Sequence, residues 1–250
     1  MVAAAAMAMS AAVAVSCAST DDAAAPTTTA ARSRVITETE AAMLANLLVT
    51  NHDLGGADVE ATVPFGSSSF DLTGAIDWVN HVGRLTVTPT VEGATQPSFD
   101  VVFNQTVVFE EVPGLAERLR AQARPAANWI ARPLDVATSP LDIVLRLIDT
   151  AASTTRDNPV LIQSRQVQWL RAELLREQPT DVFRDQRTTY WVSRDDQRLQ
   201  RLDAELEATS STAQIDFIDH GPRTIDTPAE ADIVALDSVK DLYAELRAGG

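Results

Sequence analysis

The amino-acid sequence predicts an α+β protein in which antiparallel strands outnumber the helices. Apolar residues recur at helical spacing near residue 44 and again in the middle of the chain, which favours amphipathic helices there. Between residues 57 and 109, and again beyond residue 165, apolar and polar side chains alternate with a period of two, as in strands that bury one face. Turn-forming Gly, Asn, Asp and Pro separate these segments, so we expect consecutive antiparallel strands joined by turns.

The first expected helix follows a capping-box pattern, Thr-Glu-Thr-Glu, at residues 37–40. A threonine and a glutamate at this spacing each accept a backbone N–H of the first helical turn. Leu44, Leu47 and Leu48 then follow at helical spacing. Two glycines at residues 55–56 end the pattern, which predicts an amphipathic helix between these limits.

The first set of strands begins at residue 57. Turns are expected at residues 66–67, 80–83 and 93–97, where Gly, Ser, Asn and Pro gather. The apolar positions that define the buried face are Val59, Ala61, Val63, Phe70, Leu72, Ile76, Trp78, Leu85, Val87, Phe99, Val101, Phe103, Val107 and Phe109.

Two further helices and a second set of strands complete the pattern. Leu115 and Leu119 indicate one helix, and Ser139-Pro140 starts the other, because Ser caps a helix and Pro fits its first position. A short strand is expected between them at residues 128–130, and a C-terminal helix follows Ser238. Further strands are expected at residues 160–162, 165–175, 182–183, 187–193, 199–206, 214–219 and 233–235.

The N-terminal segment resembles an export signal that ends at the only cysteine, Cys17. Residues 1–16 carry no charge, and the small residues before Cys17 form a lipobox-like pattern. We therefore expect a lipoprotein signal peptide at residues 1–16, lipidation of Cys17, a flexible tether at residues 17–34 and one domain at residues 35–250. Ala14 stands where a lipobox usually has Leu, and basic residues are missing. An ordinary secretory signal is the alternative.

Charge and cysteine content exclude several classes of function. The chain has 20 Lys and Arg against 35 Asp and Glu, a formal net charge of −15, and no basic cluster that could neutralise phosphates. Nucleic acid is therefore not expected as a partner. The same acidity disfavours electrostatic attachment to anionic lipid, so membrane attachment would depend on acyl chains at Cys17. With one cysteine, no intramolecular disulfide can form.

The sequence shows no pattern typical of catalysis or metal binding. His52, His81 and His220 fall in expected loops and have no neighbouring ligand pattern. The Gly-Ser-Ser-Ser stretch at residues 66–69 lacks the context of a nucleophile elbow. Paired carboxylates at residues 21–22, 110–111 and 195–196 are interpreted as solvated turns. We expect no metal, no cofactor and no enzymatic activity.

Three stretches carry a resemblance to a known family. Residues 189–201 read Thr-Tyr-Trp-Val-Ser-Arg-Asp-Asp-Gln-Arg-Leu-Gln-Arg, an aromatic strand, an Asp-rich turn and an Arg-Leu-x-Arg strand. Residues 215–221 end a strand in Asp-His-Gly, and residues 70–78 form an early Phe-Asp-Leu-Thr-Gly strand. Together with the order of elements, they resemble the actinobacterial LppX/LprG-like lipoproteins, which have a LolA/LolB-like lipid-carrier fold. Residues 180–186 depart from that pattern, because they lack a Gly-containing hairpin.

The resemblance implies a strongly curved antiparallel sheet, a half-open barrel, with helices covering its concave face and lipid between the two layers. A closed core, in which the same side chains pack against Leu44, Leu47, Ile143 and Leu147, is the alternative. The candidate cavity-lining residues are Phe70, Leu72, Ile76, Trp78, Leu85, Val87, Phe99, Val101, Phe103, Val107, Phe109, Trp129, Trp169, Trp191 and Leu202.

The implied function is that of a monomeric envelope lipoprotein, anchored on the extracytoplasmic face of the cell membrane, which binds and carries or presents a hydrophobic ligand. The expected partners are a lipid or glycolipid, the membrane and an envelope transporter. Arg118, Arg120 and Arg124 are expected to attract an anionic head group. The alternative is an envelope structural or sensor module that has no ligand cavity.

Overall fold

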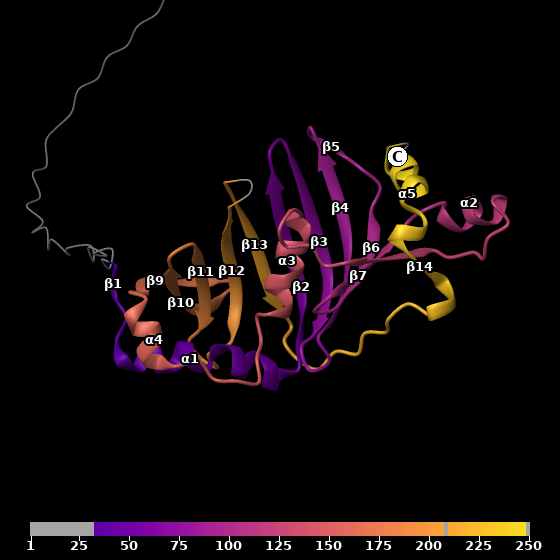
Figure 1. Cartoon of the computed structure of the whole chain (residues 1–250). Coiled ribbons are helices and arrows are strands. Elements are labelled where there is room, and N and C mark those ends of the chain that lie inside the picture. The colour runs from indigo at the N-terminus through magenta and orange to yellow at the C-terminus, as the bar shows by residue number, and fades with distance from the viewer. Residues whose placement is uncertain (1–32, 208–209, 249–250) are drawn as a thin grey trace, which may run out of the picture. The chain divides into compact units, whose positions relative to one another are not determined.

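One large sheet organises the part of the chain that the computed structural model describes, residues 33–207 and 210–248. The signal peptide, the lipidation of Cys17 and most of the tether were predicted for residues that lie outside this part. Within it, the sheet contains 14 strands and runs from β1 at one edge to β14 at the other, so it curves without closing (Figure 1). This architecture confirms the predicted α+β class with a half-open antiparallel sheet.

Neighbouring strands in the sheet pair antiparallel, except that β14 pairs parallel with β8. The path is β1-β9-β10-β11-β12-β13-β2-β3-β4-β6-β7-β8-β14, and β5 pairs with β4 beside it. The two predicted strand sets therefore join where β13 pairs with β2. The strands are β1 (Arg34–Val35), β2 (Gly56–Phe65), β3 (Ser68–Asp77), β4 (Val82–Val91), β5 (Ala94–Thr95), β6 (Phe99–Phe103), β7 (Val107–Glu111), β8 (Trp129–Pro133), β9 (Gln168–Leu175), β10 (Gln178–Asp185), β11 (Thr188–Ser193), β12 (Leu199–Leu206), β13 (Ser211–Ile218) and β14 (Ile233–Ala235).

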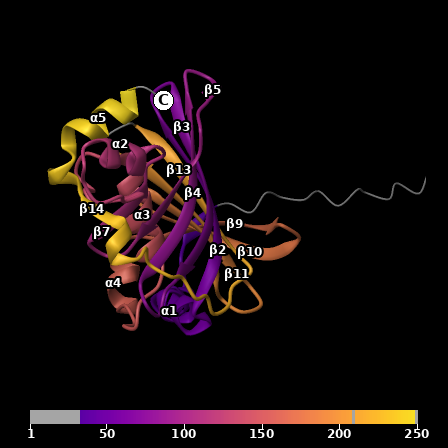
Figure 2. The same ribbon diagram turned by 90° about the vertical axis from the view of Figure 1, so that its right-hand side faces the viewer.

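The helices gather on one side of the sheet, its concave face (Figure 2). They are α1 (Glu38–Leu54), α2 (Leu115–Ala121), α3 (Pro140–Asp149), α4 (Pro159–Ser164) and α5 (Lys240–Ala248), with two 3₁₀ turns, η1 (Glu230–Asp232) and η2 (Leu236–Ser238). None of the helices in the described ranges is both long and apolar enough to cross a membrane.

The predicted helix caps are present. Thr37 and Glu40 form the capping box of α1, and Gly55 ends that helix in the left-handed conformation, with φ of 90°. The side chain of Ser139 accepts a hydrogen bond from the backbone N–H of Asp142, and Pro140 occupies the first turn of α3. Local sequence therefore sets where both helices begin.

One predicted strand is wrong. Residues 160–162 belong to α4, which begins at Pro159 after an Asn158 cap whose side chain accepts from the N–H of Val160 at 2.9 Å. A short apolar run fits a strand or a helix equally well by periodicity. The Asn-Pro pair before it favours a helix, because Asn caps a helix and Pro fits its first turn.

The main core lies between the sheet and helices α1 and α3. Buried polar bonds fix the helices to the sheet. Asn51 of α1 is fully buried, donates to the carbonyl of Ala151 at 2.7 Å and accepts from the N–H of Leu199 at 3.1 Å. The indole N–H of Trp78 donates to the carbonyl of Ile148 at 3.0 Å. The core therefore specifies the position of each helix as well as its burial.

A second, smaller core lies beyond β7, where α2, β14 and α5 pack together (Figures 1 and 2). Its buried residues come from three separate parts of the sequence, so the C-terminal segment closes this end of the fold. The members are Val112, Leu115, Leu119, Ala127, Ile130, Val239 and Leu242.

Candidate binding pocket

A pocket of about 1010 Å³ lies between the end of the β2–β3 hairpin, β6–β8, the start of α3 and helix α5. Ligand pockets for small molecules usually measure roughly 300–1,000 Å³, so this one is large enough for a sizeable apolar ligand. Several lining residues, among them Pro97, Pro113 and Glu245, are exposed, and the pocket is open to solvent beside them.

One part of the pocket wall is apolar. The β2–β3 turn brings Phe65 and Phe70 together, and their rings stack with centroids 4.5 Å apart and planes at 29°. Phe99 at the start of β6 and Leu141 near the start of α3 extend this wall toward the core. Leu246 of α5 also lines it. Aromatic and aliphatic side chains in this arrangement suit the hydrocarbon part of a ligand.

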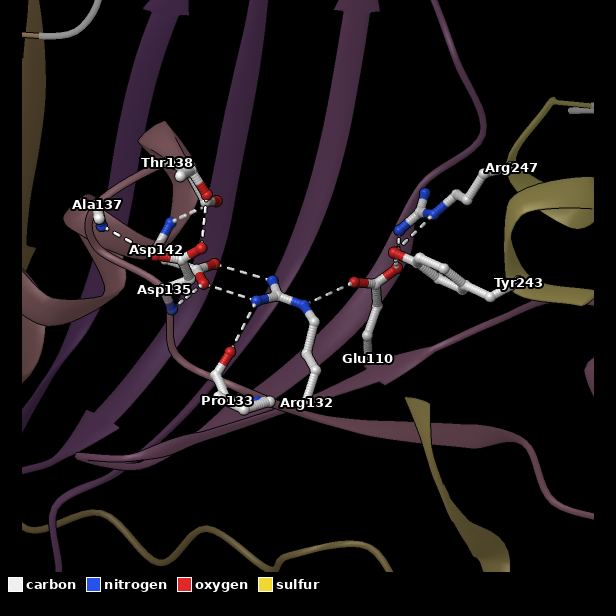
Figure 3. Close-up of polar contacts among 10 residues, drawn as sticks. Glu110, Arg132, Pro133, Asp135, Ala137, Thr138, Asp142, Tyr243 and Arg247 are labelled. Carbon is white, nitrogen blue, oxygen red and sulfur yellow. Dashed lines mark hydrogen bonds and ion pairs between the residues drawn. The ribbon is translucent and has the colours of Figure 1, made fainter. Parts of the chain in front are cut away.

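The other part of the wall is polar and centres on Glu110 of β7, which is 2% exposed. Its carboxylate accepts hydrogen bonds from the hydroxyl of Tyr243 at 2.8 Å and from Nη2 of Arg247, both on α5. Nε of Arg132 approaches the other carboxylate oxygen at 3.5 Å (Figure 3). Glu110 therefore joins the sheet to the C-terminal helix.

Arg132 extends this network to α3. Its guanidinium donates two hydrogen bonds to Asp142, at 2.6 and 2.8 Å, and Asp142 is fully buried (Figure 3). The backbone N–H of Asp135 donates to the same carboxylate at 2.7 Å. Burial acts to lower the pKa of Arg132, but the bonds to Asp142 outweigh it and the pKa is raised. The pair is bidentate and its carboxylate is well satisfied, as a buried ion pair requires.

The two groups that α5 contributes to the network differ in character. Burial raises the pKa of the Tyr243 hydroxyl, so it remains a donor to Glu110 at neutral pH. Burial lowers the pKa of Arg247, whose guanidinium lies over the ring of Phe99, 4.3 Å from its centroid. Arg247 thus borders both the apolar and the polar parts of the wall.

Of the residues predicted to line a cavity, Phe70 and Phe99 line this pocket. Trp78 packs against Phe217, with centroids 5.5 Å apart, in the main core. Whether any of the predicted residues contacts a ligand stays a prediction. The others in the main core cluster are Leu72, Ile76, Leu85, Val87, Val101, Phe103 and Leu202.

The remaining predicted residues lie elsewhere. Val107 and Phe109 are half-buried and alternate with Val108, which belongs to the main core, so they face the other side of β7. Arginine side chains lie over the rings of Trp129, Trp169 and Trp191, at 5.8, 4.7 and 5.6 Å respectively. These three indoles contact cations, and Trp169 also packs against the main core.

Of the three arginines predicted to attract a head group, only Arg118 lines this pocket. Arg118 also forms an ion pair with Glu245 of α5. Arg124 instead donates to the carbonyl of Ser238 at 3.0 Å, and Arg120 is an exposed residue of α2 outside the pocket lining. Sequence reasoning thus found one of the pocket arginines.

Glu110, Arg132, Tyr243 and Arg247 were not predicted as pocket residues. The pair at residues 110–111 was interpreted as a solvated turn, which is wrong, because both residues belong to β7 and Glu110 is buried. The predicted parity of this strand is also wrong: Val107 and Phe109 were expected on the buried face, whereas Val108 and Glu110 are the buried residues of β7. The cationic partners of Glu110 lie more than 20 residues away, where spacing gives no signal.

The histidines form no common site. His81 contacts Asp149 at 2.9 Å between Nδ1 and the carboxylate, and His220 donates from Nε2 to the carbonyl of Leu199 at 3.0 Å. His52 lies in the last turn of α1. Within residues 33–207 and 210–248, no three His, Cys, Asp or Glu side chains gather in a way that could hold a metal ion.

No model of a known protein family matches the chain. No curated protein matches it either. Similar solved structures include an uncharacterised conserved protein from Thermus thermophilus, with 11% identity over 79% of this chain and 99% of that one and a TM-score of 0.41. A putative outer membrane lipoprotein-sorting protein domain from Vibrio parahaemolyticus shares 10% identity over 78% and 97% of the two chains, with a TM-score of 0.31.

A LolA superfamily protein from Nitrosomonas europaea is also similar, with 10% identity over 76% of this chain and 96% of that one and a TM-score of 0.28. Every one of these TM-scores is below 0.5. The likenesses therefore assign neither a family nor a function.

Proposed function

We propose that this protein is a non-enzymatic lipoprotein of the cell envelope that binds a hydrophobic ligand in the pocket beside α5 and carries or presents it. The observation that carries the proposal is the pocket itself, about 1010 Å³ in volume, whose wall has an apolar part and a polar part that meet at Phe99 and Arg247. Such a division suits an amphiphile, whose tail and head need different surroundings.

The rest of the concave face supports this location. Between the sheet and helices α1 and α3 the core is tightly buried, with Leu85, Val144 and Ile148 at 0% exposure. Side chains at zero exposure border no solvent-sized space, so an acyl chain beside them would have to displace packed side chains. A ligand held on the concave side would therefore occupy the end of the sheet near the β2–β3 turn.

Burial of hydrocarbon supplies enough free energy for binding. Each methylene removed from water contributes about 0.8 kcal/mol. Association costs on the order of 4–15 kcal/mol in lost freedom of movement. A tail of about ten to sixteen methylenes contributes about 8–13 kcal/mol, which exceeds the cost over the lower part of that range without many specific polar contacts. Such a modest surplus suits a carrier that must also release its ligand.

The N-terminal sequence supports the envelope location in this proposal. Small residues precede Cys17, the position at which a lipoprotein signal peptidase would cut and at which acyl chains would be attached. Acyl chains would hold the protein at the membrane, the source of an amphiphilic ligand. The predicted tether, residues 17–34, would give the domain reach from that anchor.

Native mass spectrometry tests the proposal. The full chain carries Cys17→Ser, so that no acyl group of its own is attached, and is purified from a host rich in membranes. We expect a mass excess that organic extraction removes and that contains lipid. Phe70→Asp should lower the loaded fraction at least fivefold, because a carboxylate beside Phe65 disfavours hydrocarbon.

Leu174→Asp is the matched control, because Leu174 is 71% exposed on β9 and lies outside the pocket lining. It should leave loading unchanged. A clean apo mass, both as purified and after incubation with envelope lipids, would contradict the proposal and favour the structural or interaction module. Equal loss of loading in both variants would place the ligand elsewhere.

A further inference from the structure

Three arginines line the polar wall of the pocket, Arg118, Arg132 and Arg247, beside the carboxylates of Glu110 and Glu245. Asp142, which pairs with Arg132 but does not line the pocket, balances the third arginine. The wall is therefore close to neutral in a chain whose formal net charge is −15. A neutral wall that presents arginines repels an anion less than the acidic surface of the rest of the protein does.

The three arginines are not equivalent. Arg132 is 14% exposed in its side chain and is occupied by Asp142, by Glu110 and by the carbonyl of Pro133. Each of these contacts is within the protein, and two involve buried carboxylates. Arg132 therefore holds the wall together, and it has little capacity to bind a ligand.

Arg247 has N–H groups that are not used in the network around Glu110. Its Nη2 donates to Glu110 and its Nε donates to the hydroxyl of Tyr243 at 3.3 Å, whereas Nη1 has no hydrogen-bond partner in the described part of the chain. The side chain remains 40% exposed, at the mouth of the pocket. Its guanidinium carbon lies over the ring of Phe99, 4.3 Å from the centroid.

Glu110 holds Arg247 in place. Arg132 already pairs with the buried Asp142 and lies 3.5 Å from Glu110, so drawing Arg247 away would leave two buried carboxylates sharing one arginine. An incoming anion therefore binds Arg247 through its free Nη1 side while Nη2 stays on Glu110. Arg118 is more easily recruited, because its pair with Glu245 is solvent-exposed on both sides, at 51% and 62%.

We propose that the ligand is an anionic amphiphile whose carboxylate or phosphate head group is bound by Arg247, with Arg118 as a second cation of the same pocket. This inference rests on the proposed function and names the ligand class. The hydrocarbon part then lies over Phe99 and toward the stacked Phe65 and Phe70 rings. A bidentate head is favoured, because a guanidinium presents parallel N–H donors.

Four amphiphiles with the same twelve-carbon tail test this assignment on the full chain carrying Cys17→Ser, each used below its micelle concentration. They are dodecanoate, dodecyl phosphate, dodecan-1-ol and dodecyltrimethylammonium. We expect both anions to bind at least tenfold more tightly than the alcohol, the cation to bind most weakly, and added salt to reduce the preference. Inorganic phosphate alone should bind at least a hundredfold more weakly than dodecyl phosphate, which separates a lipid head from free phosphate.

Arg247→Gln should remove most of the anion preference, with a loss of tenfold or more for dodecanoate and less than threefold for dodecan-1-ol. Arg247→Lys should keep part of it, and less for the phosphate, since a lysine cannot form a bidentate contact. Arg187→Gln is the matched control, because Arg187 is an exposed arginine paired with Glu207 outside the pocket. Thermal melts check that each variant is folded.

The outcomes separate the two proposals. Equal binding of the anions and the alcohol by the unsubstituted chain would overturn the head-group assignment and leave the proposed function standing. An anion preference that survives Arg247→Gln would overturn the role of Arg247. If no amphiphile binds, both proposals fail.

Discussion

The fold changes the charge state of His220. Burial, followed by the nearby positive charge of Arg198, lowers the pKa of its imidazole to about 4, from an ordinary value of about 6.5. The ring donates to the carbonyl of Leu199 and lies 6.0 Å from the ring of Trp78, centroid to centroid. The folded protein therefore contains neutral His220 at neutral pH.

This shift predicts a pH dependence of stability. Between pH 6.5 and 4 the unfolded chain binds a proton at this site that the folded chain does not, so the free energy of unfolding rises with pH over that interval. The contribution is complete above pH 6.5, is lost as the pH falls through about 4, and amounts to on the order of 3 kcal/mol. Urea unfolding of the unsubstituted chain and of His220→Gln from pH 4 to 7 measures it.

The free energy of unfolding of His220→Gln should depend less on pH between 4 and 6.5 than that of the unsubstituted chain. Parallel curves for the two chains would mean that His220 is not held neutral, and would contradict the burial-based explanation. Because the experiment reads the difference between two chains, other groups that titrate in the same range cancel to first order.

Residues also mark the limit of what sequence could predict about the site. Phe70 and Phe99 were predicted to line a cavity because both lie on the apolar face of an alternating strand pattern, which is visible locally in the sequence. Glu110 and Arg247 are 137 residues apart in the sequence, and no local pattern around either residue predicts the other as its partner. Long-range ion pairs of this kind depend on topology, which periodicity does not reveal.

At the scale of elements, a close approach between β4 and β6 depends on Gly83. Gly83 of β4 and Phe103 of β6 are directly paired in the sheet, and the Phe103 ring lies over the glycine. A Cβ placed on Gly83 would lie 2.2 Å from two carbons of the Phe103 ring, far inside van der Waals contact. The absence of a side chain at residue 83 therefore lets Phe103 enter the core.

We expect Gly83→Ala to destabilise the protein by about 1–3 kcal/mol, because Phe103 must move within a close-packed core. In a Phe103→Leu background the same substitution should cost clearly less, since the smaller side chain leaves room for a methyl group. Urea unfolding of the four chains of this double-mutant cycle tests the contact. An equal cost of Gly83→Ala in both backgrounds would show that the ring does not constrain residue 83.

Elements were predictable to the extent that their signals are local. The capping box at Thr37 and the Ser139-Pro140 start identified α1 and α3 before any tertiary contact was known. Alternation identified the strands in the same way. Helix α4 was missed because six residues are too few for a helical period to stand out from a strand.

At the scale of the whole molecule, the half-open sheet accounts for the pocket. Because the sheet does not close, the edge formed by β7, β8 and β14 needs another cover, and the small core of α2 and α5 supplies it. The pocket lies where this cover meets the main part of the concave face. A segment from the end of the sequence thus completes a site that begins near residue 65.

The most direct test of this account maps where a ligand lies. A fatty acid with a photoreactive diazirine in its tail is bound to the full chain carrying Cys17→Ser, irradiated, and its cross-linked peptides are identified by mass spectrometry. The account predicts cross-links in peptides containing residues 65–70, 89–99 or 243–247, which dodecanoate in excess suppresses. Cross-links confined to β9–β11, or labelling that competitor does not reduce, would contradict ligand binding in the pocket beside α5.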